Sequence, residues 1–100
     1  MESTASQFKH LFNKYRLRAG FETLNDFGNK LASEGYAYED SMFSRWKHGT
    51  RIPKNRKIIL AMIKIFIRYH GINTVEEAND LLYSLDFTGL HWEEIKQIAP

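Results

Sequence analysis

The chain has 100 residues, of which 43% are apolar, enough to pack the core of one small domain and too many for a disordered chain. The formal net charge is only +2, and the absence of cysteine excludes disulfides, thiolate catalysis and cysteine-ligated zinc. The longest apolar run covers residues 58–63, far short of the ~20 residues of a membrane span, and the N-terminus lacks the apolar centre of a signal peptide, so we expect a soluble, cytoplasmic domain.

The first helix is predicted over about 5–19. Apolar residues recur at the i, i+3, i+4 and i+7 positions of one face: Phe8, Leu11, Phe12 and Tyr15. Thr4 and Gln7 are expected to form a capping box before this helix, and Gly20 is expected to stop it. The basic residues fall mostly off the apolar face: Lys9, Lys14, Arg16 and Arg18.

The second helix is predicted over about 24–33. Thr23 followed by Asp26 gives its start signal. The apolar stripe consists of Leu24, Phe27 and Leu31. Because Gly28 costs about 1 kcal/mol of helix propensity relative to alanine, we interpret it as a place where another helix approaches closely.

A short third helix is predicted over about 40–48, after a turn around residues 35–37. Phe43 and Trp46, three residues apart, form its buried pair, and Gly49 is its C-terminal stop.

The fourth helix is predicted over about 54–70, ending at Gly71. Its apolar face is broad: Ile58, Ile59, Met62, Ile63, Phe66 and Ile67. Such a face indicates burial on more than one side, so this is predicted to be the central helix. Thr74 and Glu77 start a fifth helix with five inward residues: Val75, Ala78, Leu81, Leu82 and Leu85.

These patterns predict an all-α fold, a compact bundle of five helices, or of six if the short segment containing Trp92, Ile95 and Ile98 is also helical. We expect a single domain over residues 1–100 with its core in 5–85. Residues 86–100 are then either a short C-terminal extension or the start of a linker.

Catalytic and metal-binding patterns are weak, and we expect neither an enzyme nor a cofactor. The four histidines lack a ligand partner at helical spacing: His10, His48, His70 and His91. The adjacent glutamates at 76–77 and 93–94 point to different helix faces, and the glycines lack a phosphate-cradling spacing.

The charges are segregated along the chain. Residues 41–75, here called the acid-free segment, carry eight basic side chains and no acidic one, between flanks that sum to −4 (21–40) and −5 (76–100). A cluster of polar residues, all basic except Asn55, covers the end of the third helix, the following loop and the start of the fourth helix: Arg45, Lys47, His48, Arg51, Lys54, Asn55, Arg56 and Lys57. The alternatives are a solvated surface and a phosphate-binding surface; cations at the start of the fourth helix oppose the helix dipole, which favours an anionic partner.

The stretch 8–85 resembles the Cro-repressor-like (XRE-type) helix-turn-helix family. The resemblance rests on Phe8-x-x-Leu11 leading to Arg16-Leu17-Arg18-Ala19-Gly20, on Thr23 with Phe27-Gly28-x-x-Leu31, and on Phe43-Ser44-Arg45-Trp46-Lys47-His48-Gly49 followed by Arg51-Ile52-Pro53. The last segment is the most specific part.

The resemblance implies a set of roles. The motif core would be Phe27, Gly28, Leu31, Phe43 and Trp46, with Tyr38 as an apolar contact before the recognition helix. The DNA-binding residues would be Ser41, Ser44, Arg45, Lys47, His48, Thr50, Arg51, Lys54 and Arg56. For Arg45, a base or phosphate contact and a surface ion pair are both open.

The sequence departs from the family pattern at three points. The turn between the second and third helices is longer by about five residues, Ser33–Ala37. The first turn of the third helix carries Glu39 and Asp40, where the family has neutral or basic residues, and Leu24 occupies a position where the family often has glutamine. Carboxylates at that place repel phosphates unless one accepts from a cytosine amino group.

Two functions follow from this sequence. The first is a module for double-stranded DNA in transcriptional regulation, with the helix over about 40–48 in the major groove and the basic loop 47–57 on phosphates. The second is a helical protein-interaction module of a multidomain signalling protein that does not bind DNA. The resemblance also implies a bacterial regulatory or signalling protein with this domain at its N-terminus and fused C-terminal domains; no membrane contact is expected, and the oligomeric state stays open.

Overall fold

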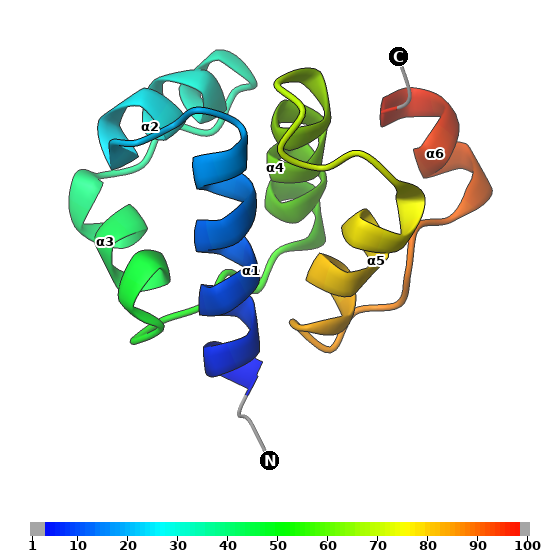
Figure 1. The fold of residues 1–100 in the computed structure, drawn as a ribbon, viewed down its shortest axis with the longest axis horizontal. Helices are drawn as coiled ribbons and strands as arrows, with labels where there is room; N and C mark the ends of the chain where they lie inside the picture. The colour runs from blue at the N-terminus through cyan, green and yellow to red at the C-terminus, as the bar shows by residue number, and fades with distance from the viewer. Residues whose placement is uncertain (1–3, 99–100) are drawn as a thin grey trace.

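The computed structural model describes residues 4–98 and contains six helices joined by loops (Figure 1). In chain order they are α1 (Thr4–Arg18), α2 (Leu24–Ser33), α3 (Asp40–His48), α4 (Arg56–Arg68), α5 (Val75–Tyr83) and α6 (Trp92–Ile98). The described range contains no β-strand, so the all-α prediction is confirmed, and the bundle has the sixth short helix. None of the helices in residues 4–98 has the length and hydrophobicity to cross a membrane.

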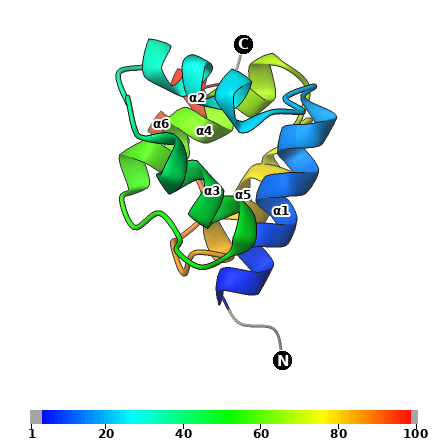
Figure 2. The ribbon, with the colours of Figure 1, turned by 90° about the vertical axis from the view of Figure 1, so that its left-hand side faces the viewer.

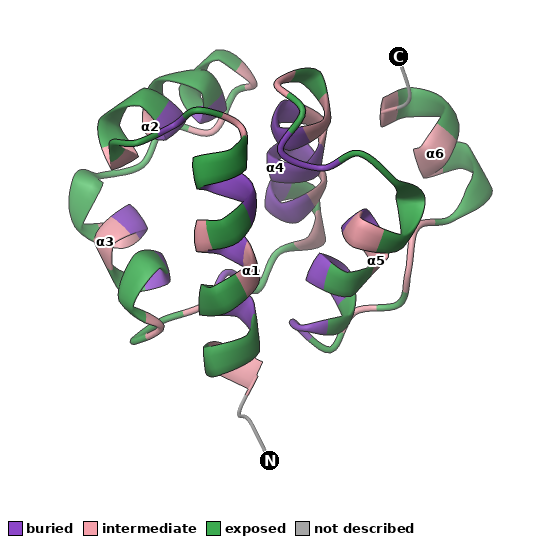
Figure 3. Ribbon diagram, viewed as in Figure 1, coloured by how far each residue is buried: buried purple, intermediate pink, exposed green. Residues whose placement is uncertain are grey.

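Aromatic side chains from four helices meet at the centre of the core. Phe12 of α1 contacts Phe27 of α2, Trp46 of α3 and Phe66 of α4, with ring centroids 5.4, 6.2 and 6.3 Å apart. Figure 3 shows buried residues along the inner sides of these helices, most densely on α4. The broad apolar face of α4 therefore lies at the centre of the bundle, as predicted.

The start and stop signals of three helices are confirmed by their local geometry. Thr23 Oγ1 accepts a hydrogen bond from the backbone N–H of Asp26 at 3.2 Å, and Thr74 Oγ1 accepts one from Glu77 at 3.1 Å. Gly49 ends α3 in the left-handed conformation, with φ of 72°.

The end of α4 differs from the prediction. The helix stops at Arg68, and the residue with left-handed backbone after it is His70 (φ 65°), not Gly71. Gly71 has another reason to be glycine: a Cβ there would overlap the carbonyl oxygen of Tyr15 and lie 2.9 Å from Ala19 Cβ. Gly71 thus permits the close approach of the α4–α5 connection to α1.

Two residues of α1 also depart from the predicted pattern. Thr4 is already helical, and its hydroxyl donates to Asp86 Oδ2 at 3.4 Å instead of capping the helix. Arg16, predicted off the apolar face, is buried. Its Nη1 donates to the carbonyl oxygens of Phe21 and Glu22 at 2.6 and 3.0 Å, so Arg16 fixes the loop between α1 and α2.

Arg56 holds α6 and the preceding loop against the start of α4. Its Nε and Nη2 donate to the two carboxylate oxygens of Glu94 at 2.9 and 2.8 Å. The same guanidinium donates to the carbonyl oxygens of Thr88 and Gly89, both at 2.9 Å. The chain after α5 is therefore packed back onto the bundle, where Ile98 lies against the core.

Replacing Glu94 with glutamine is expected to destabilise the fold by about 1–3 kcal/mol at pH 7. The Arg56 hydrogen bonds lower the pKa of Glu94 from its usual 4.5 to about 2. A carboxyl whose pKa is lower in the folded state stabilises the fold above its unfolded pKa, and this contribution is lost as the pH falls. In urea unfolding between pH 7 and pH 2, the difference in free energy of unfolding between the parent protein and the Glu94→Gln variant should therefore decrease from pH 5 downward.

The matched control is Glu93→Gln, which removes the neighbouring exposed carboxylate. Glu93 forms no ion pair within residues 4–98, so its variant should keep the stability and the pH dependence of the parent. Equal behaviour of the two variants would contradict the assigned role of Glu94.

Candidate nucleic-acid interface

Aromatic packing fixes the inner side of α3. Phe43 and Trp46 are buried with their ring centroids 5.4 Å apart, as the spacing predicted. Tyr38, in the connection before α3, sets its ring edge-on to both, at 6.3 and 6.2 Å. The two rings of α3 and the preceding tyrosine thus set the rotation of this helix about its axis.

The contact between α2 and α3 depends on Gly28. Phe27 and Leu31 are buried on the inner side of α2, and the Phe27 ring lies 5.8 Å from that of Phe43. A Cβ on Gly28 would lie 2.9 Å from Cε2 of Phe43, so the predicted close approach of another helix at this glycine is confirmed. The connection between the two helices covers residues 34–39.

Four predicted DNA-contacting residues fall on one side of α3, here called the α3 outer face: Ser41, Ser44, Arg45 and His48. Their i, i+3, i+4, i+7 spacing places them on the side opposite Phe43 and Trp46. Ser44 is half-buried and the other three are exposed. α3 lies on the surface of the molecule that faces the viewer in Figure 2. The burial of one side of α3 therefore presents the other side to solvent.

α1 fixes the C-terminal end of α3 through residues that the sequence pattern did not single out. Asn13 Nδ2 donates to the carbonyl oxygen of Lys47 at 3.0 Å and to that of Lys9 at 2.9 Å. A Cβ on Gly49 would lie 3.2 Å from Cδ of Lys9, so the Lys9 side chain lies against this turn. Lys9 is exposed and adds a cation beside the end of α3.

The loop after α3 turns back onto the helix. The backbone N–H groups of Thr50 and Arg51 donate to the carbonyl oxygen of Arg45 at 3.0 and 3.4 Å. The Thr50 hydroxyl points to the same oxygen at 3.4 Å. These bonds satisfy the end of α3 and keep Arg51 close to it, so the loop leaves the helix in a defined direction (Figure 2).

Ion pairing divides the basic side chains of the acid-free segment into two groups. Three bind carboxylates: Arg56 binds Glu94 at 2.8 Å, and Lys64 and Arg68 bind Glu34 at 3.1 and 3.8 Å. Five exposed ones form no ion pair with any residue in the described range, and we call them the basic strip: Arg45, Lys47, Arg51, Lys54 and Lys57. The basic strip is continuous along the chain, from α3 to the first turn of α4.

Arg56, which was predicted to contact DNA, has partners within the fold at every guanidinium nitrogen. All three of its guanidinium nitrogens donate to Glu94 or to the loop before α6. Hydrogen bonding to Glu94 raises the pKa of Arg56, because the ion pair favours the charged form. A phosphate would have to displace a bidentate carboxylate, so Arg56 has a structural role and does not belong to the candidate interface. Sequence alone gave no signal of a partner 38 positions away.

The start of α3 carries the opposite charge. Glu39 precedes the helix with extended backbone and forms no side-chain cap, and Asp40 lies in the first turn. Both residues are exposed. Acidic groups at a helix start and basic groups at its end are each stabilising, so part of this polarity serves α3 itself. The charge nevertheless changes sign between the start of α3 and its end.

The histidines and carboxylates do not gather into a metal site: residues 4–98 contain no group of three or more histidine, cysteine, aspartate or glutamate side chains placed to hold an ion. Comparison with protein-family models, with curated proteins and with solved structures gave no match to this chain.

Proposed function

We infer that the protein binds double-stranded DNA, with the α3 outer face toward the major groove and the basic strip on the phosphate backbone. The residues proposed to reach base edges are Ser41, Ser44, Arg45 and His48. Arg45 belongs to both groups: it offers the bidentate donor geometry that recognises guanine in a specific site, and it binds phosphate on DNA of other sequence. The basic strip supplies the sequence-independent part of the binding energy. Transcriptional regulation in a cytoplasmic bacterial protein is the setting that the helix-turn-helix resemblance implies.

One observation carries this proposal: within residues 4–98 the basic strip has no carboxylate partners, while every other cation of the acid-free segment has one. Basic residues that serve solubility alone are usually interspersed with acidic ones. The five cations fall within residues 45–57, a stretch without acidic residues, and a polyanion offsets this concentration of positive charge. Lys57 also lies in the first turn of α4, where a cation opposes the helix dipole, so helix stability does not account for it.

The test is the salt dependence of binding to a labelled random-sequence 20-bp duplex, measured by fluorescence anisotropy. If the basic strip occupies about five phosphates, the slope of log K against log salt should be near −4 to −5, so that affinity falls roughly 10²–10³-fold between 50 and 200 mM salt. A slope near zero, or no binding at 50 mM salt, would contradict the proposal.

A second candidate function is a protein-interaction module, and the specific observation in its favour is the acidic start of α3. Glu39 and Asp40 flank the α3 outer face, and carboxylates there repel phosphates. In this alternative the basic strip meets an acidic protein surface. A variant without these two carboxylates distinguishes the two functions.

Changing Glu39→Gln together with Asp40→Asn is expected to strengthen duplex binding about 3- to 10-fold at 0.1 M salt, because two repulsive charges are removed near the groove. Anisotropy titration with the same duplex gives the measurement. The matched control is Glu76→Gln with Asp80→Asn, which removes two exposed carboxylates from α5 and should change affinity much less. An equal gain in both variants would mean that net charge alone is responsible, and no gain would place the start of α3 away from DNA.

A further inference from the structure

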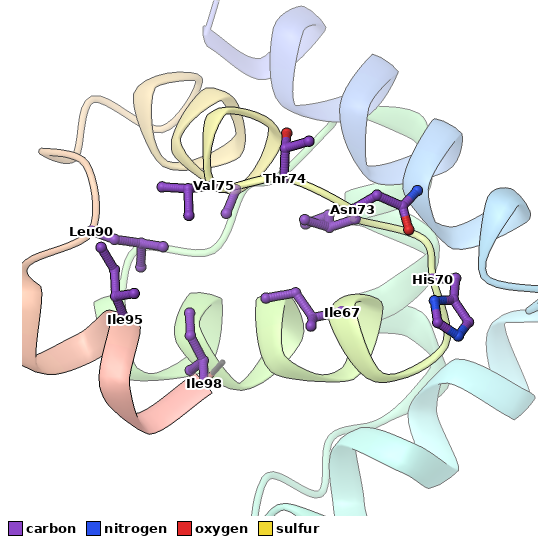
Figure 4. Close-up of a pocket in the computed structure, with 10 residues that line it drawn as sticks. Ile67, His70, Asn73, Thr74, Val75, Leu90, Ile95 and Ile98 are labelled. Atoms are coloured by element: carbon purple, nitrogen blue, oxygen red, sulfur yellow. The ribbon is translucent and has the colours of Figure 1, made fainter. Parts of the chain in front are cut away.

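A cavity of about 260 Å³ lies between α4, α5 and the segment that carries α6. Its walls are mainly aliphatic, with contributions from Ile67, Val75, Leu90, Ile95 and Ile98. Figure 4 shows these side chains pointing toward a common space. The cavity is open to solvent, because four residues of its lining are exposed: His70, Asn73, Thr74 and Val75. A small molecule can therefore reach the aliphatic wall.

The cavity leaves exposed a residue that the pattern of α5 places inward. Val75 retains 48% of its accessible surface, although it was predicted to belong to the core. Its side chain lines the cavity together with Ile95 and Ile98 of α6. The inward side of α5 is therefore not fully packed at Val75. A small apolar ligand in the cavity would cover this exposed apolar surface.

Polar groups gather at the opposite end of the cavity. The side chains of His70 and Asn73 line it there (Figure 4), and neither forms a hydrogen bond within residues 4–98. His70 also has a left-handed φ of 65°, at the position after a helix end where glycine is the usual residue. Both side chains are exposed, so their polar groups are accessible to a ligand that enters the cavity.

We propose that this cavity binds a small monocarboxylic acid with an apolar body of about eight carbons, its carboxylate at His70 and Asn73 and its chain against the aliphatic wall. The volume sets the size: a 150 Å³ apolar cavity accommodates benzene, so about 260 Å³ takes a molecule of roughly ten non-hydrogen atoms. The two side chains set the head group, since imidazole and amide N–H groups donate to carboxylate oxygens. This site is independent of the basic strip and of DNA binding.

The experiment is an NMR titration of the ¹⁵N-labelled full chain with octanoate, 1-octanol and butyrate. Octanoate should give saturable shifts at the residues that line the cavity, with a dissociation constant of roughly 0.1–1 mM. Octanol lacks the carboxylate and butyrate lacks the chain, so each should bind at least roughly five-fold more weakly. Absence of saturable shifts at 10 mM octanoate, or shifts confined to the basic strip, would overturn the proposal.

Two variants separate the apolar wall from the polar end. Val75→Phe adds bulk at a residue that is already half-exposed, fills the cavity, and should abolish the octanoate shifts while leaving the spectrum folded. His70→Gly removes the imidazole and relieves the strained backbone, so it should unfold at a higher temperature and bind octanoate and octanol equally. Unchanged octanoate binding in Val75→Phe, or an unchanged preference for the acid in His70→Gly, would contradict the assignment.

Discussion

Replacing Arg45, Arg51 and Lys54 with alanine is expected to weaken duplex DNA binding roughly 30- to 300-fold at 0.1 M salt and to reduce the salt slope by about 3 units. These residues span the basic strip from α3 to the residues just before α4, and none of them forms an ion pair within the described part of the chain. Because all three are exposed, their truncation should leave the unfolding temperature nearly unchanged. Anisotropy and thermal unfolding of the same preparation measure both quantities.

The control removes three cations from elsewhere: Lys64, Arg68 and Lys96. The first two bind Glu34, and the third lies 5.3 Å from the centroid of the Trp92 ring. Net charge changes by the same amount in both triple variants. The control should lose less than about three-fold in affinity, since non-contacting charges act only through the screened field of the molecule. Equal losses would show that overall charge, and not the basic strip, determines binding.

Replacing Trp46 with alanine is expected to lower the free energy of unfolding by about 3–5 kcal/mol. The side chain is 2% exposed, and its ring contacts those of Phe12, Phe43 and Tyr38. A domain of this size has a stability of roughly 5–15 kcal/mol, so the loss is a large fraction of the total. Urea unfolding followed by far-UV circular dichroism gives the measurement.

The other tryptophan provides the matched control. Trp92 is 65% exposed, and Trp92→Ala should change the free energy of unfolding by less than about 0.5 kcal/mol from lost burial. A similar cost at both positions would contradict the placement of α3 against the aromatic core. A selective cost at Trp46 supports the packing that orients the α3 outer face.

The helices and the inner side of α3 were predictable because they depend on neighbours along the chain. Thr23 and Thr74 cap with residues three positions ahead, and Phe43 and Trp46 lie one turn apart. Gly28 was also informative, since a glycine inside a helix is costly unless another element needs the space. Periodicity of this kind also defined the α3 outer face, as the side opposite the buried pair.

The long-range partners were not predictable from one sequence. Arg56 pairs with Glu94 across 38 positions, and Asn13 bonds to the backbone of Lys47 across 34. In the sequence, nothing distinguishes Arg56 from its basic neighbours, so the same phosphate contact is predicted for all of them. Arg16 is a similar case, because a charged residue is buried only when tertiary structure supplies its hydrogen-bond partners.

The structure changes the interpretation of the charge pattern more than that of any other sequence feature. In the sequence the acid-free segment is one block of eight cations. In the fold, Arg56 pairs with Glu94, and Lys64 and Arg68 share Glu34. The basic strip, from α3 to the first turn of α4, is left without an ion pair in residues 4–98. In Figure 1, α3 and α6 lie on opposite sides of the molecule, so the basic strip begins far from the acidic C-terminal helix. The ion pairs of the folded protein are therefore needed to distinguish the basic strip from the other cations of the acid-free segment.

NMR mapping tests most directly whether duplex DNA contacts the α3 outer face and the basic strip. Adding a 20-bp duplex to the ¹⁵N-labelled protein at 50 mM salt should shift the amide signals of residues 41–57, together with Lys9 beside the end of α3. The signals of α5 and α6 should stay in place. Shifts centred on α5 or α6, or an unchanged spectrum at saturating duplex, would contradict the account.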